Sequence, residues 1–283
     1  MKRKCAFAGL IFALMLMTLL GAGRAADRKV VRVTSPGSMF GRMHTISALF
    51  SRDQPMIQID FVRSADVDTS FSALIERSTD IALTTRRITP TEDQLAKSQG
   101  MELTGRVIGH GGIVLITAPG NPIDGLTLDQ VRKAFTGECT NWRELGGSDG
   151  PITVVRVGEN YPGTNFFMQE DLFGGRPFAA NAVVVPEFNN VLRKVAQSAG
   201  SLGFVRIRDA FESPIPFEMA VKVLKVRKDA ASPAIQPSRA TIADSSYPIL
   251  RPYYVYYESK ADTSIVKYVE FLEKKGWGQQ NLL

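Results

Sequence analysis

Short apolar runs alternate along the chain with segments in which apolar residues recur at the spacing of a helix. Runs typical of buried strands occupy residues 29–35, 57–62, 80–85, 111–117, 152–157 and 182–187. Segments typical of amphipathic helices occupy residues 43–52, 71–78, 127–135, 165–173 and 189–200. Strands that alternate with helices in this way predict an α/β fold with largely parallel sheets flanked by helices.

Four junctions after predicted strands are rich in small and hydroxyl residues. They are TSPGSM at 34–39, RSADVDTS at 63–70, TTRR at 84–87 and YPGT at 161–164. In α/β folds, ligands gather beyond the carboxyl ends of the strands, where helix starts offer unpaired N–H groups and partial positive charge. Several helix starts aimed at one point predict an anion site. For any single junction the alternative is an ordinary helix cap, with Ser38, Thr69 or Thr164 as the capping residue.

The first residues have the features of a secretory signal peptide. Three basic residues at positions 2–4 precede an apolar run from Ala6 to Leu20, and small residues flank Arg24 before a predicted cut at Ala26. The run is shorter than the roughly 20 residues that a membrane-spanning helix needs. We therefore expect residues 1–25 to be a cleaved signal peptide and the mature protein to be periplasmic. An uncleaved membrane anchor is the alternative.

Loss of the signal peptide changes both the charge and the cysteine count. Lysine plus arginine falls from 34 to 30 against 28 aspartate plus glutamate, so the net charge falls from +6 to +2. The basic balance comes partly from the signal peptide, and we expect no nucleic-acid partner. Cys139 is then the one remaining cysteine, so stability must come from the core rather than from an internal disulfide. A mature length of about 258 residues suits one large or two medium domains.

Taken in order, the segments resemble those of the phosphate-binding subunits of ABC importers. TSPGSM resembles the Ser-Gly-Ser/Thr opening of that family, and DIALTTRRITPTE is similar to its Asp-Ile-Gly-x-Ser-Ser-Arg segment. GGIVLITAPGNPIDGLTLDQVRKAFTGECTNWRELGG resembles a longer family segment of strand, Asn-Pro turn, helix and Asn-Trp loop. RVGENYPGTNFF, GSLGFV and YPILRPYYVYY are similar to three later segments. The resemblance spans roughly residues 30 to 280.

The resemblance implies a two-lobed periplasmic binding protein that closes on its ligand. We expect lobe one at residues 27–110 plus 211–283 and lobe two at 111–210. The chain would cross between lobes near 107–112 and 203–209, where glycines suit hinge segments. The implied ligand is inorganic phosphate or a similar oxyanion, bound without a metal or other cofactor. The implied partner is an ABC permease, and we expect a monomer.

The resemblance also implies a set of anion-binding residues. Carried over position by position, the set is Ser35, Gly37, Ser38, Met39, Ser64, Asp66, Thr85, Arg86, Arg156, Gly163 and Thr164. Two loops depart from the family pattern, because SADVDTS replaces a Gly-Ser-Gly-x-Gly loop and Pro162 replaces a serine, with the loss of a hydroxyl and a backbone N–H. Arg156 can bind two oxygens of a tetrahedral anion. Its alternative role is an ion pair with Glu159 or Glu170.

The acidic residues of the second junction allow two interpretations. An ionised carboxylate in a dry cleft would repel a dianion. Asp68 is interpreted as the cap of the helix that follows. Asp66 could instead accept a proton from hydrogen phosphate, a contact that sulfate cannot provide because it carries no proton at neutral pH. The second interpretation would give the site its specificity.

The sequence shows no catalytic constellation. His44 and His110 are the only histidines, Cys139 has no partner motif, and no G-x-S-x-G, CxxC or H-E-x-x-H sequence occurs. We therefore predict a binding protein with no catalytic residues. The alternative function is an extracytoplasmic sensor that docks on a membrane signalling receptor, with altered or lost phosphate specificity.

Overall fold

The computed structural model describes residues 28–211 and 221–275. The predicted signal peptide at residues 1–25 lies outside these ranges. Within them, none of the helices combines the length and the apolar character needed to cross a membrane. The described residues form two halves, each with its own strands and hydrophobic core.

The first half, here called the β1 half, is built mainly from the first part of the chain. Its strands are β1 (Lys29–Pro36), β2 (Ile57–Ser64), β3 (Ile81–Thr84) and β11 (Leu250–Glu258), and its helices are α2 (Gly37–Asp53), α3 (Val67–Ile75), α4 (Pro90–Ser98) and α11 (Thr263–Lys275). β1 pairs in parallel with both β2 and β3, so the carboxyl ends of these three strands lie at one edge.

Helix α2 shows how the core of the β1 half forms. Its large buried residues recur every three or four positions, as Met39, Met43, Ile46 and Phe50. Residues at that spacing share one face of a helix. The apolar face packs against β1 and α11, where Phe50 lies edge-on to the ring of Tyr268 at 5.1 Å between centroids.

The second half, here called the β6 half, has the larger hydrophobic core. Its strands are β6 (Thr153–Val157), β7 (Val183–Val185) and β8 (Ser201–Arg206), with β5 (Gly125–Thr127) and β10 (Lys225–Arg227) in a small separate sheet. Its helices are α5 (Leu128–Thr136), η1 (Trp142–Leu145), α6 (Pro162–Phe166), η2 (Phe167–Leu172), α7 (Phe188–Ala196), α8 (Ile207–Phe211) and α10 (Arg239–Ala243). Phe135, Val155 and Phe204 are among the residues buried at its centre.

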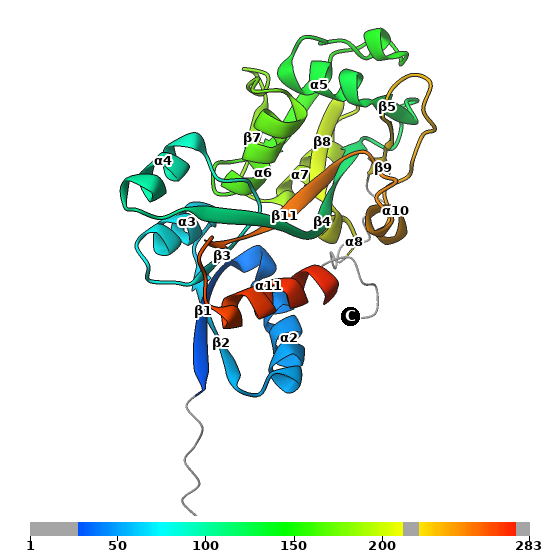
Figure 1. The fold of residues 1–283 in the computed structure, drawn as a ribbon. Helices are drawn as coiled ribbons and strands as arrows, with labels where there is room; N and C mark the ends of the chain where they lie inside the picture. The colour runs from blue at the N-terminus through cyan, green and yellow to red at the C-terminus, as the bar shows by residue number, and fades with distance from the viewer. Residues whose placement is uncertain (1–27, 212–220, 276–283) are drawn as a thin grey trace, which may run out of the picture.

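One long strand, β4 (Leu103–Thr117), joins the two halves into a single sheet. Its residues 103–112 pair with β11, residues 113–117 pair with β8, and β9 (Lys222–Val223) pairs with its end. The resulting order is β2-β1-β3-β11-β4-β8-β6-β7, and β4 and β11 run through the middle of the molecule (Figure 1). The α/β fold class is therefore confirmed. The sheet is more mixed than predicted, because β4 and β11 pair antiparallel with their neighbours in it.

The glycines expected at the first crossing lie within β4. A Cβ on Gly111 would come within 2.3 Å of the Tyr253 hydroxyl. Gly105, which lies earlier in β4 than the expected crossing, is similar, because its Cβ would come within 2.3 Å of the Tyr256 ring. These two glycines leave space for the side chains of Tyr253 and Tyr256 of β11. Glycine is therefore required at these two positions by the packing of the tyrosines.

The return passage between the halves differs from the one expected near 203–209. β8 stays within the β6 half, and Leu224, Tyr247 and Ile249 are buried in the core of that half. The chain enters the β1 half again where β11 begins at Leu250, because residues 221–249 contribute apolar side chains to the other core. Of the residues 211–283 that we expected in lobe one, 221–249 thus pack with the β6 half. The division into two lobes itself stays a prediction.

Candidate functional site

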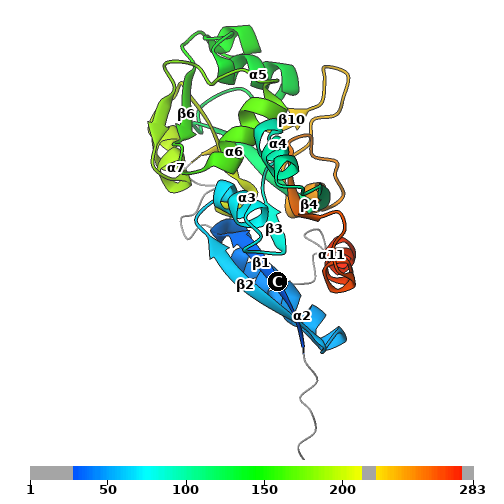
Figure 2. The ribbon, with the colours of Figure 1, turned by 60° about the vertical axis from the view of Figure 1, so that its left-hand side comes forward.

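The predicted anion-binding loops meet at the edge where β1, β2 and β3 end. Pro36 lies beside Ser64 in the β1–β2 register, and β3 ends next to β1. The start of α6 approaches the same edge from the β6 half, since a Cβ on Gly163 would lie 2.1 Å from Thr85 Oγ1 and 3.4 Å from Val67. Figure 2 shows α3 and α6 next to each other between the halves. The structure therefore brings the second, third and fourth junctions into contact.

The first junction begins α2 without a side-chain cap. Pro36 occupies the N-cap position and makes no side-chain cap hydrogen bond, and the first turn has no acidic residue. Ser35 is fully buried just before it. Ser38 O accepts a hydrogen bond of 3.1 Å from Arg208 Nη1 of α8. The Met39 side chain is fully buried in the core of the β1 half, so only its backbone could contribute to the predicted site.

Arg63 is a cation beside this helix start that the sequence analysis did not select. A Cβ on Gly37 would lie 2.7 Å from Arg63 Nη2. The guanidinium therefore covers the first residue of α2 from the end of β2. The signal available in the sequence was its place, one residue before Ser64 at the carboxyl end of a predicted strand.

At the second junction, Asp66 caps α3, and the interpretation of Asp68 as the cap is wrong. Asp66 Oδ1 accepts hydrogen bonds of 2.8 Å from both the backbone N–H and the hydroxyl of Thr69. The Thr69 backbone N–H is the largest cause that holds the pKa of Asp66 below its usual value, against a smaller opposing effect of burial. Ser64 Oγ lies 2.7 Å from Ser70 Oγ. The polar side chains of this junction therefore form hydrogen bonds with the first turn of α3.

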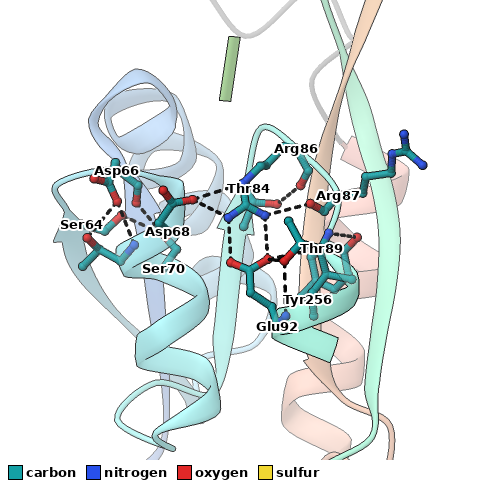
Figure 3. A network of polar contacts seen from close by, with 12 residues as sticks. Ser64, Asp66, Asp68, Ser70, Thr84, Arg86, Arg87, Thr89, Glu92 and Tyr256 are labelled. Atoms are coloured by element: carbon teal, nitrogen blue, oxygen red, sulfur yellow. Dashed lines mark hydrogen bonds and ion pairs between the residues drawn. The ribbon is translucent and has the colours of Figure 1, made fainter. Parts of the chain in front are cut away.

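At the third junction, Arg86 is enclosed by two carboxylates. Its guanidinium bonds both oxygens of Glu92, at 2.8 and 2.7 Å, and also pairs with Asp68, as Figure 3 shows. Burial alone would raise the pKa of Glu92, but hydrogen bonds from Arg86 and Thr89 lower it below its usual value. Thr85, just before, is buried. The charge of Arg86 is thus neutralised within the β1 half.

At the fourth junction, the structure shows Arg156 in the alternative ion pair. Arg156 Nη1 lies 2.9 Å from Glu159 Oε1 and donates to Val157 O at 3.1 Å. Its guanidinium carbon lies 4.9 Å from the centre of the Phe178 ring. Whether Arg156 also contacts an anion stays a prediction.

Thr164 contacts a second arginine that the sequence analysis did not select. Thr164 Oγ1 accepts a hydrogen bond of 3.0 Å from Arg251 Nη1. Both residues are only 3% exposed, and Arg251 comes from β11, far away in the sequence. The signal was a charged residue inside the otherwise apolar and aromatic run YPILRPYYVYY, which the analysis had used only for the family resemblance.

Other candidate chemistry is sparse in the described residues. They contain no group of three or more His, Cys, Asp or Glu side chains that could hold a metal ion. Cys139 is buried, and burial raises the pKa of its thiol. Burial also lowers the pKa of His110.

Comparisons with known proteins agree with this architecture. A family model described as a PBP superfamily domain matches residues 22–274. The phosphate-binding protein PstS of Bacillus subtilis is 24% identical over 63% of this chain, and that of Borreliella burgdorferi is 24% identical over 68%. The matches cover 56% and 66% of those two proteins.

Solved structures share the fold. An ABC-type phosphate transport receptor from Vibrio cholerae has a TM-score of 0.66 at 22% identity, covering 87% of this chain and 94% of that one. A putative phosphate ABC transporter substrate-binding protein from Clostridium perfringens, with bound phosphate, has a TM-score of 0.58 at 22% identity, with 86% and 93% covered. Because the family model matches nearly the whole described chain and the resemblance from the sequence agrees with it, this chain belongs to the PBP (periplasmic binding protein) superfamily.

Proposed function

We propose that this protein captures inorganic phosphate, or a closely related oxyanion, between the two halves of its sheet and delivers it to an ABC importer. The observation that carries the proposal is that two helices start without a side-chain cap. α2 and α6 both begin without a side-chain cap and without an acidic residue in the first turn. By contrast, α4, α5 and α10 begin with reciprocal capping boxes. α7 also lacks a side-chain cap bond, but its N-cap residue is the acidic Glu187.

An uncapped helix start leaves N–H donors that need acceptors. At α6 this applies to Gly163, because Pro162 has no N–H and Tyr161 O accepts at 3.0 Å from the N–H groups of Thr164 and Asn165. The buried hydroxyls of Thr85 and Thr164 lie at the same junctions and can add donors. The buried Ser35 hydroxyl donates to Pro36 O at 3.3 Å, so it can bind an anion only by exchanging that bond. A tetrahedral oxyanion presents acceptor oxygens in several directions, so it can accept from both halves at once and hold them together. We propose that these donors bind the anion without a metal ion.

The wider role follows from the relatives described above, which are named as phosphate-binding and phosphate-transport proteins. On that basis we infer a binding protein that docks on an ABC permease. From the sequence we further propose that it is periplasmic and monomeric, performs no catalysis and binds no nucleic acid. A sensor docked on a signalling receptor is the second function that the sequence left open. No feature of the described residues favours it.

Calorimetric titration of the mature chain tests the proposal. We expect saturable binding of one phosphate per chain. Sulfate, arsenate and molybdate should bind more weakly or not at all, and the titrations rank their dissociation constants. Small-angle scattering of the same samples should show a smaller radius of gyration with phosphate, because an anion held by both halves favours their approach. The absence of saturable binding for all four anions would overturn the proposed function.

A further inference from the structure

We propose that Arg251 is the buried positive charge of the anion site and that it holds the Thr164 hydroxyl as a hydrogen-bond donor toward the bound anion. The inference deepens the proposed function and rests on it. It assigns to β11 a role in binding, whereas the predicted binding residues all come from the four strand–helix junctions.

The first support is that no counter-charge contacts Arg251, because the charges of Asp209 and Arg206, themselves an ion pair, act on it with opposite signs. Arg251 is 3% exposed, and no carboxylate of the described residues lies within 4.0 Å of it. Two other arginines with little exposure behave differently, because Arg86 pairs with Asp68 and Glu92, and Arg206 pairs with Asp209. A charge removed from water is unfavourable unless it is paired and hydrogen-bonded. An unpaired buried guanidinium therefore indicates that an anion is the missing partner.

The second support is the direction of the hydrogen bond to Thr164. A guanidinium has donors only, so Thr164 Oγ1 must be the acceptor of the 3.0 Å bond from Arg251 Nη1. The hydroxyl proton of Thr164 then stays available for another acceptor. Thr164 follows Gly163, which lies against Thr85 of the β1 half. The oriented hydroxyl is thus at the contact between the halves, where the proposed anion binds.

The third support is that the arginine expected to supply the charge of the site already has an ion-pair partner. Arg156, which the family resemblance made the main cation of the site, pairs with Glu159 and covers Phe178. Its pair with Glu159 is electrically neutral. Arg251 therefore contributes a net positive charge that Arg156 does not. Burial, its largest influence, lowers the pKa of Arg251, and the nearby Tyr253 partly offsets that effect. The guanidinium keeps its proton all the same, as arginines do in proteins.

Two substitutions separate charge from geometry. Arg251→Met removes the charge and keeps much of the volume, while Arg251→Lys keeps the charge and removes the planar fork. With inorganic phosphate as the probe, we expect Arg251→Met to raise the Kd at least thirtyfold, the scale for truncating one partner of a buried charge pair. We expect Arg251→Lys to raise it less, but at least threefold, because a lysine cannot orient the hydroxyl in the same way. Arg77→Met is the control, since Arg77 pairs with Glu258 on the surface at the other end of β11.

Thermal unfolding separates this role from a purely structural one. If Arg251 is an unpaired charge without phosphate, Arg251→Met should leave the Tm of the phosphate-free protein unchanged or higher and should reduce the Tm rise on adding phosphate. A lower Tm without phosphate together with a wild-type Kd would overturn the inference. If Arg251→Met does not fold, Arg251→Lys decides, and a wild-type Kd in that variant overturns the inference. Failure of the wild-type chain itself to bind phosphate would instead contradict the proposed function.

Discussion

The two sides of the candidate site use their polar groups in opposite ways. On the side of α3 and α4, the donors already bond to acceptors within the chain. The Thr69 N–H donates to Asp66, and Arg86 donates to Glu92. On the side of α6 and β11, the helix start has no side-chain cap, and Arg251 has no carboxylate within 4.0 Å among the described residues. The comparison teaches that buried charge alone does not mark a ligand site. The balance between donors and acceptors around it does.

The largest expected effect comes from closing the gap between the two sides with a side chain. In Gly163→Val, the added Cβ would lie 2.1 Å from Thr85 Oγ1 and 3.4 Å from Thr85 Cβ and Val67. Either the Thr85 hydroxyl must rotate out of the site or the start of α6 must move away from Thr85. We expect phosphate affinity to fall by about a hundredfold, since a displacement of about 1 Å can have that effect on a preorganised site. Calorimetry measures it. Gly41→Ala is the matched control, because no atom lies within 4 Å of a Cβ at Gly41, and equal affinities of both variants would contradict the predicted contact.

The next effect should appear in stability on the saturated side. Glu92→Gln removes one of the two carboxylates around the buried Arg86, and we expect the free energy of unfolding to fall by about 2 kcal/mol, measured by urea titration. The effect should depend on pH. Because the pKa of Glu92 is lowered in the folded protein, its stabilisation is present above the unfolded pKa of about 4.3 and is lost as pH falls through the folded pKa.

Wild type and Glu92→Gln should therefore converge in stability as the solution becomes acidic. Glu273→Gln is the control, because its pair with Arg106 lies at the surface, and it should change stability little. A difference between wild type and Glu92→Gln that persists at the lowest pH would show that the carboxylate charge is not the cause.

A smaller effect is expected at Asp66. Asp66→Ala should lower the free energy of unfolding by about 1 kcal/mol through loss of the α3 cap, whereas Asp66→Asn should keep most of it, since asparagine is an equally good N-cap. Asp66→Asn also tests the interpretation of this carboxylate as a proton acceptor. We predict that the preference for phosphate over sulfate decreases in this variant. An unchanged preference would leave Asp66 with the cap alone.

The smallest effect is expected for an exposed ion pair between the halves. Arg87, after β3, pairs with Asp171 of η2, and the two side chains are 54% and 25% exposed. Asp171→Asn should weaken phosphate binding by no more than about fivefold, because exposed pairs contribute about 1 kcal/mol or less. The difference from wild type should disappear in high salt. Asp149→Asn, which breaks a pair with Arg143 inside the β6 half, should not change the affinity.

Much of the candidate site could be predicted from local sequence, and the reasons are physical. Hydroxyl and glycine residues at the ends of predicted strands mark the junctions, because parallel strands place those ends at one edge. The local signal could not separate Asp66 from Asp68, since both precede the same helix and either could cap it. Which one turns toward Thr69 and which toward Arg86 depends on β3, a strand that is separate in sequence.

The amino-acid sequence by itself determined the α/β fold class, the family resemblance and the position of the junctions. The signals for these features are the spacing of apolar residues and the residue types at turns and helix starts, and each extends over only a few residues. Only the tertiary structure decided which donors remain available to a ligand. Glu92 reaches Arg86, Glu159 reaches Arg156, and Arg251 reaches Thr164 across 87 positions. Ion pairing and burial depend on distances between side chains in space, so the charge balance of a site is set only when the strands are paired and the two halves meet.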